Sequence, residues 1–235
     1  PIFAVNASSA GNPFLRTTEQ AFGDKLHTYT IVDAINDGNV LPFRIDYINT
    51  MRMADNVLDE KVAAIDNERA LAAPERIREV VGYILDHFDQ KTMRSSFYSL
   101  KGQRVAGFNA LFAVASISMA MQYYTEFKRQ LAERQRNLTI ATIFSYSINE
   151  DDLEDILPDE NFDTDKLDVT QRDFLDAAIQ DYNQAFNVNF DTSSDKFENY
   201  YKDLSMRVKN REVDLLIVVN MFLTGFDATT LNTLW

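Results

Sequence analysis

The sequence predicts an α/β fold in which a mainly parallel sheet is flanked by helices. Residues 108–115, 138–144 and 213–219 are continuous apolar runs of the length that strands buried on both faces require. Between the first two runs lies a helical pattern with apolar residues on one side and charged residues on the other. Strand, helix and strand in this order are typical of a right-handed βαβ unit, which makes the strands parallel.

The composition argues against several kinds of site. The 235 residues can form one large domain or two small ones, and without cysteine they form neither disulfides nor a thiolate zinc site. The only histidines, His27 and His87, stand far apart, which argues against a histidine metal centre. No apolar run reaches the roughly 18 residues of a membrane span, so we expect no membrane contact. The net charge of −13 argues against DNA binding through a broad basic surface but leaves room for a local groove.

Both ends of the sequence are expected to lie inside a longer polypeptide. The sequence opens on Pro1 before an apolar triplet, with no basic leader, and stops at Leu234-Trp235 within the pattern of a new strand. We therefore interpret it as an excerpt.

Helical patterns dominate the first part of the chain. Residues 1–25 lack a sustained period and predict a connecting loop with a short helix at residues 18–22. Apolar spacing, or a high content of alanine and charge, predicts helical segments at residues 26–35, 51–73 and 74–90. Asp37-Gly38 supplies a stop after the helical pattern of residues 26–35, since glycine tolerates a positive φ, and the helix at residues 74–90 begins at Pro74, a favourable first-turn residue. Residues 42–48 alternate like a half-exposed strand, and residues 91–107 predict a loop or an extended connection.

The second part alternates strands with helices and is interrupted once. Its helices are predicted at residues 117–134, 171–187 and 195–209. The interruption, residues 147–170, is rich in carboxylates with a single lysine, so we predict an exposed acidic insertion. A domain boundary is predicted after residue 73, with a linker and surface helix in residues 1–73 and the α/β domain in residues 74–235.

Two short matches to metal sites are rejected. Residues 159–165 alternate like the start of an EF-hand, but Thr164 and Thr170 stand where the glycine and the bidentate glutamate are needed. Glu126-Phe127-Lys128 has the spacing found in metal-dependent nucleases, but it lies inside an amphipathic helix. We therefore predict no metal ligands in this sequence.

Two segments that follow buried strands could carry chemistry. Ser116 and Ser118 lie where a helix begins, and its amides with their hydroxyls could hold a phosphate; helix capping is the simpler interpretation. After the last buried strand comes Thr-Gly-Phe-Asp. There Gly225 allows close backbone approach, Thr224 can donate to a phosphate oxygen, and Asp227 can accept from a ribose hydroxyl. A plain tight turn is the alternative. No phosphate-binding glycine loop precedes either segment, so the excerpt cannot hold a nucleoside triphosphate alone.

Two well-separated stretches resemble one protein family. Residues 214–228, DLLIVVNMFLTGFDA, closely resemble helicase motif V as it appears in HsdR, the motor and restriction subunit of type I restriction enzymes. Residues 22–42 resemble the segment that follows the first motor domain in that family, and Pro1-Ile2-Phe3 resembles the end of the preceding Thr-Gly-Thr-Pro motif. The likeness covers most of the chain, and the matches occur in the order of the family.

The resemblance implies a fold and an activity. The excerpt would be the linker and second RecA-like domain of a superfamily 2 motor, closing over ATP and Mg²⁺ that the first RecA-like domain of the same chain mainly holds. It would then be part of an ATP-dependent translocase of double-stranded DNA within a bacterial, cytoplasmic type I restriction endonuclease. Its partners would be the DNA backbone and the methyltransferase and specificity subunits.

The resemblance also implies roles for two short segments. We predict DNA contacts at Ser116, Ser118, Thr224 and Gly225, and a nucleotide cleft at Gly225, Phe226 and Asp227. The arginine finger of this family belongs to a motif expected after Trp235, so neither Arg207 nor Arg211 is assigned to it. No catalytic residue is assigned within the excerpt.

Two other function classes stay open. The acidic insertion and the surface helix could dock another subunit, which would make the chain an acidic α/β interaction module without direct ATP or DNA contact. A free-standing nucleotide-binding protein is disfavoured because the phosphate loop is absent. A Walker loop and an acidic box encoded upstream of Pro1 would favour the motor.

Overall fold

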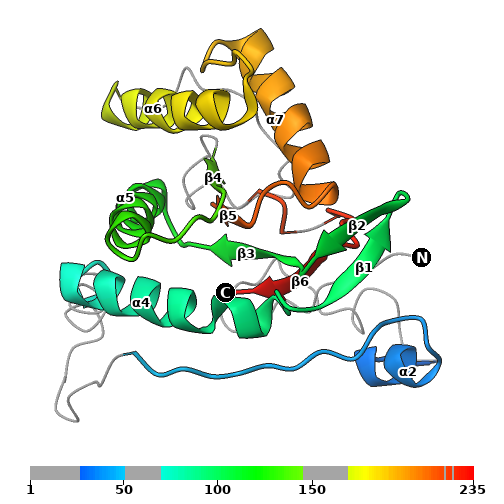
Figure 1. Ribbon diagram of the computed structural model, residues 1–235. Helices are drawn as coiled ribbons and strands as arrows, with labels where there is room; N and C mark the ends of the chain where they lie inside the picture. Colours follow the sequence, from blue (N-terminus) through cyan, green and yellow to red (C-terminus); the bar gives the residue numbers. More distant parts are fainter. Residues whose placement is uncertain (1–26, 51–69, 145–168, 220, 224) are drawn as a thin grey trace, which may run out of the picture. The chain divides into compact units, whose positions relative to one another are not determined.

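The computed structural model of the chain describes residues 27–50, 70–144, 169–219, 221–223 and 225–235 (Figure 1). By compactness the chain divides into two units, residues 1–49 and residues 50–235. The predicted helix at residues 18–22, most of the surface helix at residues 51–73 and nearly all of the acidic insertion lie outside the described residues. The predicted boundary after residue 73 stays a prediction.

The described part of the first unit contains one short helix, α2 (Ile31–Asn36), as predicted. Its start is fixed by a capping box: the Thr30 hydroxyl accepts from the Asp33 amide, and the Asp33 carboxylate accepts from the Thr30 amide. Its end leads into Gly38, whose φ is +74°. The sequence signal for the end of this helix therefore has a structural counterpart, whereas the capping box at its start was not predicted.

The predicted strand at residues 42–48 is wrong. These residues are exposed and form no strand, and the Tyr47 side chain is 91% exposed. An alternating sequence satisfies its backbone only when a neighbouring strand pairs with it, and the described residues provide no such neighbour.

A four-stranded parallel sheet forms the centre of the second unit. Its strands are β3 (Asn109–Ala113), β4 (Ile140–Ile143), β5 (Leu215–Val218) and β6 (Leu231–Leu234), in the spatial order β4-β5-β3-β6. All three predicted buried strands and the strand pattern at the end of the sequence are confirmed. Strand β5 is buried along its whole length because it has a strand on each side and helices around it, which explains its uninterrupted apolar sequence.

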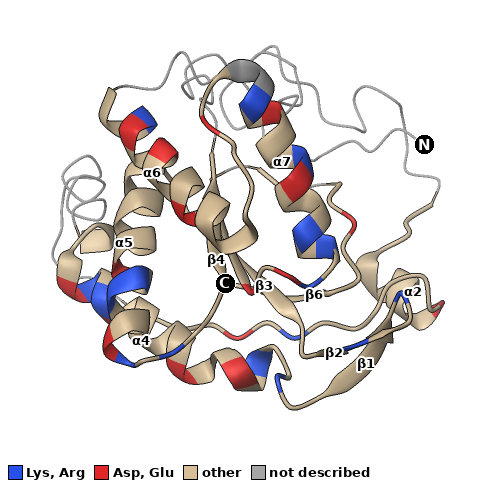
Figure 2. Cartoon of the chain, turned by 45° about the horizontal axis from the view of Figure 1, so that its top comes forward, with Lys and Arg blue, Asp and Glu red and all other residues tan. Residues whose placement is uncertain are grey.

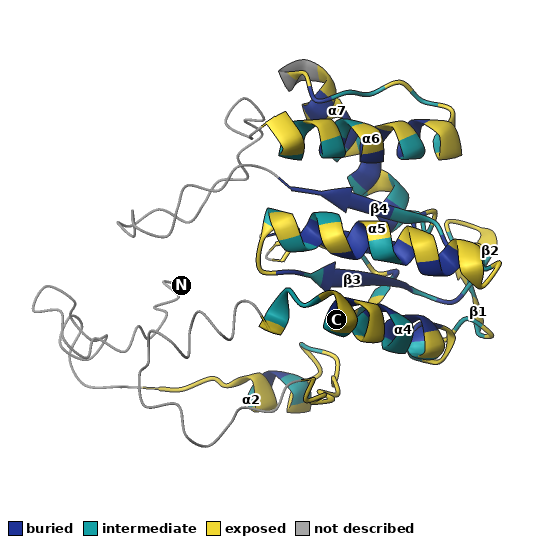
Figure 3. Cartoon of the chain, turned by 90° about the vertical axis from the view of Figure 1, so that its left-hand side faces the viewer, coloured by how far each residue is buried: buried dark blue, intermediate teal, exposed yellow. Residues whose placement is uncertain are grey.

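Helices flank this sheet and bury their apolar sides against it (Figure 3). They are α4 (Pro74–Lys91), α5 (Ile117–Glu133), α6 (Val169–Phe186) and α7 (Ser194–Lys209), close to the predicted ranges. In α5 the rings of Tyr123 and Phe127 meet Phe112 of β3 edge to face, at centroid distances of 4.8 and 5.9 Å. Tyr200 of α7 is fully buried and donates to the Thr142 carbonyl of β4 at 2.8 Å. These contacts join the helices to the sheet in one core.

Residues 97–106 form a β-hairpin where a loop or an extended connection was predicted. Strand β1 (Phe97–Leu100) pairs antiparallel with β2 (Gln103–Ala106). The turn consists of Lys101 and Gly102, with φ of +48° and +81°, and such a pair of positive φ angles suits a tight two-residue hairpin turn. The serines and glycines around this turn led to the prediction of a loop, so the hairpin was not recognised from the sequence.

The carboxylate of Asp214 joins three segments at the amino end of the sheet. It accepts from Arg94 Nη1 at 2.6 Å, from Arg211 Nη1 at 2.6 Å and from the Thr139 amide at 2.9 Å. Arg211 also donates from Nε to the Gly107 carbonyl at 3.0 Å. Because Asp214 is 8% exposed, this network satisfies a carboxylate that would be costly to bury alone.

Replacing Asp214 with alanine is expected to loosen the amino ends of β4 and β5. Removing one partner of a buried ion pair costs about 3–5 kcal/mol, because the two arginines lose their carboxylate. A loss of about 3 kcal/mol corresponds to roughly hundredfold faster exchange of amides that open locally. The measurement is hydrogen–deuterium exchange of residues 138–144 and 213–219 in the longer polypeptide. The control is Asp86→Ala, which breaks the more exposed pair with Arg134 and should cost less than about 1 kcal/mol. Equal effects of the two changes would contradict this account.

Gly107→Ala is expected to destabilise the hairpin more than Gly102→Ala. Both glycines have positive φ, so each change costs about 1 kcal/mol of backbone strain. Only at position 107 would the new Cβ overlap backbone, 2.8 Å from Arg94 Cα and 3.0 Å from the Thr92 carbonyl oxygen, whereas position 102 is open. Amide exchange of residues 97–106 measures the difference, and equal exchange in both variants would show that the close contact is unimportant.

Candidate functional site

The carboxyl edge of β3 and β5 has the topology of a ligand site. These strands are parallel neighbours, with Ala113 opposite Val218 at their ends. From β3 the chain passes through α5 to β4, on the far side of β5; from β5 it passes to β6, on the far side of β3. Each connection therefore passes across the neighbouring strand. The edge is a candidate site because ligands of open α/β sheets commonly bind outside the carboxyl ends of the strands.

Ser116 caps α5 at this edge. Its backbone is extended, with φ −151° and ψ 160°, and its hydroxyl oxygen accepts from the Met119 amide at 3.3 Å. Ser118 is also exposed, and its hydroxyl accepts from Gln122 Nε2 at 3.4 Å. Capping uses the Ser116 oxygen as an acceptor, so the hydroxyl hydrogen remains able to donate to a phosphate oxygen. The structural role predicted for Ser116 is confirmed, and its DNA contact stays a prediction.

The segment after β5 is anchored by aromatic contacts with α7. Phe222 is buried and packs on Tyr201 at a centroid distance of 4.9 Å, while Phe226 meets Phe222 edge to face at 4.6 Å. The Lys209 ammonium lies 5.2 Å from the centre of the Phe226 ring. The segment therefore follows α7 toward its last turn.

Gly225 and Asp227 are exposed on this segment. Gly225 has φ +72°, and no atom outside its immediate neighbours lies within 4 Å of the position that a Cβ would occupy. This open space leaves room for close approach of a ligand to the backbone. The predicted role of Gly225 in binding stays a prediction. Thr224 lies outside the described residues.

The structure does not bring the two predicted segments together. Phe226 lies beside Lys209 in the last turn of α7, and this turn leads into the amino end of β5. Ser116, in contrast, follows the carboxyl end of β3. Within the described ranges, no hydrogen bond, ion pair or ring contact joins Ser116 or Ser118 to residues 225–227. A shared DNA surface formed by both segments stays a prediction.

Arg207 and Arg211 have structural partners. Arg207 donates to Asp203 at 2.7 Å and to Glu212 at 2.6 Å, and Arg211, whose side chain is 5% exposed, is committed to Asp214. Removing either from these carboxylates would leave charges unpaired. Both arginines therefore have structural roles, and neither is assigned as an arginine finger.

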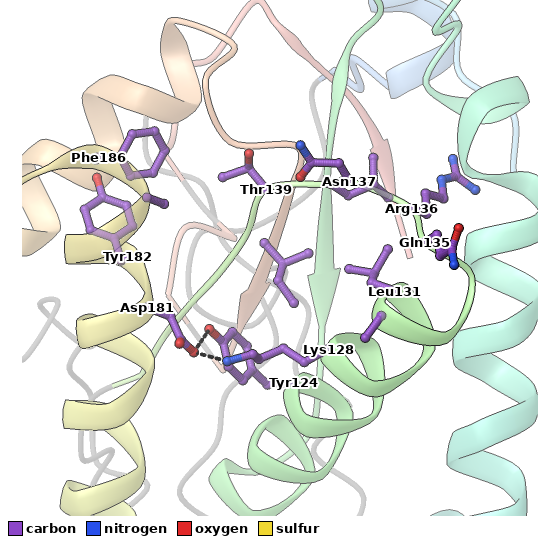
Figure 4. A pocket seen from close by; sticks show the side chains of 14 residues that line it. Tyr124, Lys128, Leu131, Gln135, Arg136, Asn137, Thr139, Asp181, Tyr182 and Phe186 are labelled. Carbon is purple, nitrogen blue, oxygen red and sulfur yellow. Dashed lines mark hydrogen bonds and ion pairs between the residues drawn. The ribbon is translucent and has the colours of Figure 1, made fainter.

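A cavity of about 460 Å³ lies between α5, α6 and the start of β4 (Figure 4). On its wall, Tyr124 donates to Asp181 at 3.0 Å, and Lys128 pairs with the same carboxylate. Burial, and then the neighbouring Asp181 charge, raise the pKa of Tyr124, so its hydroxyl stays a donor. No predicted site residue lines this cavity. The sequence did not reveal it because its walls come from separate segments.

The rejected metal motifs have no counterpart in the part of the chain that is described. Within that part, no three side chains of the ligand types His, Cys, Asp and Glu are grouped closely enough to hold a metal ion. Phe127 is fully buried in α5, and Glu126 pairs with Arg129. His87 stacks on Tyr83, while the acidic residues 159–165 lie outside the described ranges. None of the helices within those ranges is both long and apolar enough to cross a membrane.

Comparison with known families identifies the domain. Residues 106–235 match the family model described as type I restriction enzyme subunit R domain 3. The chain belongs to this R-subunit family. The matched range includes the whole parallel sheet and α5 to α7, and residues 4–75 match a model described as SWI2/SNF2 ATPase.

Individual relatives agree with this assignment. The chain is 39% identical over its full length to the endonuclease subunit of a type I restriction enzyme from Staphylococcus aureus strain COL, and 37% identical to one from Staphylococcus saprophyticus. It spans 23% of the length of each of these relatives. It is also 31% identical over 48% of its length to a putative type I restriction enzyme endonuclease subunit middle part from Mycoplasma pneumoniae, 89% of which is aligned. The predicted R-subunit resemblance and α/β fold are confirmed.

Substitutions at Ser116 test its capping role. Ser116→Ala should destabilise the first turn of α5 by about 1 kcal/mol, because the Met119 amide loses its acceptor, whereas Ser116→Asp should preserve the cap. Amide exchange of residues 117–120 is expected to accelerate roughly fivefold in the alanine variant alone. Similar exchange in both variants would show that this hydrogen bond does not hold the helix start.

Proposed function

We propose that the chain is the second motor domain of the double-stranded DNA translocase in a type I restriction endonuclease R subunit. The observation that carries the proposal is the 39% identity over the full chain to an endonuclease subunit of such an enzyme. The match of residues 4–75 to a SWI2/SNF2 ATPase supports an ATP-driven activity for the longer protein. The chain would act with the first RecA-like domain of the same polypeptide.

The residues on this domain fit one side of a nucleotide site. The open space at Gly225 permits close approach of backbone, and the exposed Asp227 carboxylate can accept a hydrogen bond from a ribose hydroxyl. Phe226, between these two residues in the sequence, packs on Phe222. These three residues would close over ATP and Mg²⁺ held mainly by the first motor domain. Bound ATP supplies the free energy of hydrolysis, with Mg²⁺ offsetting phosphate charge. Without a phosphate loop, the domain alone would be inactive.

DNA contact would use the other predicted groups. The Ser116 and Ser118 hydroxyls at the start of α5, together with Thr224 and Gly225, would bind phosphates of the duplex backbone. Closure of the two motor domains and their reopening would alternate this grip and advance the motor without reading bases. In the complete bacterial, cytoplasmic enzyme the R subunit would assemble with methyltransferase and specificity subunits.

Asp227→Ala in the full-length R subunit should lower DNA-stimulated ATP hydrolysis and translocation by about tenfold or more, because it removes a carboxylate proposed to face the cleft. ATP hydrolysis is measured with and without duplex DNA, and translocation by displacement of a strand from a triplex. Asp173→Ala is the matched control, since Asp173 is also exposed but lies on α6. Unchanged coupling in the Asp227 variant would contradict the assigned role.

A further inference from the structure

The described surface carries a concentration of basic charge that the helicase motifs do not include. Between Asp89 and Glu126 the sequence has no carboxylate, although the chain contains 36 aspartates and glutamates and has a net charge of −13. The same stretch contains four basic residues, Lys91, Arg94, Lys101 and Arg104. These four lie in the segment that runs from the end of α4 through the β1–β2 hairpin. This local charge is therefore opposite to that of the chain as a whole.

Two of these cations are exposed without a carboxylate partner in the described structure. Lys101 donates to the neutral Asn210 amide oxygen at 2.7 Å, and Arg104 lies over the Phe97 ring, with the guanidinium carbon 4.1 Å from its centre. Arg94 differs, because Asp214 compensates its charge at 2.6 Å. The hairpin therefore presents uncompensated positive charge to solvent.

The pairing of the hairpin strands places Phe97 and Arg104 on one exposed face. Phe97 lies opposite Ala106, and Ser99 lies opposite Arg104, so the ring and the guanidinium are diagonal neighbours. The Phe97 side chain is 58% exposed. A guanidinium stacked on a ring is held in place while its N–H groups remain free at the edge, which suits binding of a phosphate. Phe97 is thus a positioning residue for Arg104.

The hairpin turn is joined to the last turn of α7, which adds a third cation. The bond from Lys101 to Asn210 holds the turn beside Lys209, whose ammonium lies over Phe226. Figure 2 shows basic residues on the hairpin and on this last turn of α7. The neighbouring carboxylate of Glu212 is paired with Arg207 at 2.6 Å, and Asp227 follows Phe226. We call Lys101, Arg104 and Lys209 the basic ridge.

We propose that the basic ridge binds the phosphate backbone of the DNA duplex on which the motor acts. The inference rests on the proposed function and adds a contact outside the helicase motifs. Flexible ammonium groups and a ring-supported guanidinium bind phosphates without reading bases, as a translocating protein requires. Because Lys209 contacts Phe226, the ridge adjoins the segment proposed to close over the nucleotide, so DNA bound there would lie next to that segment.

The test replaces both hairpin cations with neutral side chains in the full-length R subunit, as Lys101→Gln with Arg104→Gln. The control is Lys196→Gln with Lys202→Gln, which removes equal charge from exposed lysines of α7 that are paired with Asp191 and Glu198. Affinity for non-specific duplex DNA is measured over a range of salt concentrations. Each lost phosphate contact lowers the slope of log affinity against log salt by about 0.9, so we expect a decrease of roughly 1.8 and no change in the control.

A second variant separates charge from folding. Lys101→Arg with Arg104→Lys retains both charges and should retain the wild-type slope of log affinity against log salt. A smaller slope in this variant would show that the shape of the hairpin, and not its charge, matters, and would overturn the proposal. An unchanged slope in the glutamine variant would also overturn it. If the glutamine variant kept the wild-type salt dependence but no longer assembled with the methyltransferase and specificity subunits, the basic ridge would be a protein contact. Wild-type protein without DNA-stimulated ATP hydrolysis would contradict the proposed function itself, which is a distinct result.

Discussion

The buried carboxylate of Asp214 is the interaction on which the arrangement of the sheet depends. It joins Arg94, which follows α4, to Arg211 and to the amide that precedes β4. These groups are far apart in the sequence, and all of them meet at the amino end of the sheet. A buried carboxylate with fewer donors would cost more free energy than it returns, so the three segments must be held together for any of them to be stable there. Because the strands are fixed at their amino ends, their carboxyl ends, and with them the candidate site, also take fixed positions.

The parts of the fold that the sequence predicted are those whose burial leaves a local pattern. A strand surrounded by other elements must be apolar throughout, and β5 is. A helix that packs on one side shows helical spacing, as α4 and α5 do. The hairpin was missed because its identity depends on the positive φ angles at Lys101 and Gly102. At residues 42–48 the opposite error occurred, because a strand was predicted where none forms. Alternation of apolar and polar residues is typical of a strand, but a strand also needs a partner strand.

The candidate site was predictable in composition but not in geometry. That Ser116 follows β3 and that Gly225 to Asp227 follow β5 can be derived from the pattern of strands. The path of the second segment cannot, because it is set by Phe222 on Tyr201 and by Phe226 beside Lys209, contacts that no local spacing encodes. The same contacts place the segment against α7 and away from the start of α5. Any joint action of the two segments must therefore span the domain.

The acidity of the chain and contact with DNA are compatible because charges act over short distances. At physiological salt an exposed charge is screened beyond about 8 Å, so a phosphate senses its neighbours more than the net charge of −13. If the chain contacts DNA as proposed, an acidic surface elsewhere would disfavour other orientations of the duplex, and a small basic area would select the orientation that is used. A motor benefits from this arrangement, because a few phosphate contacts hold the duplex in register while leaving each contact weak enough to release at every step.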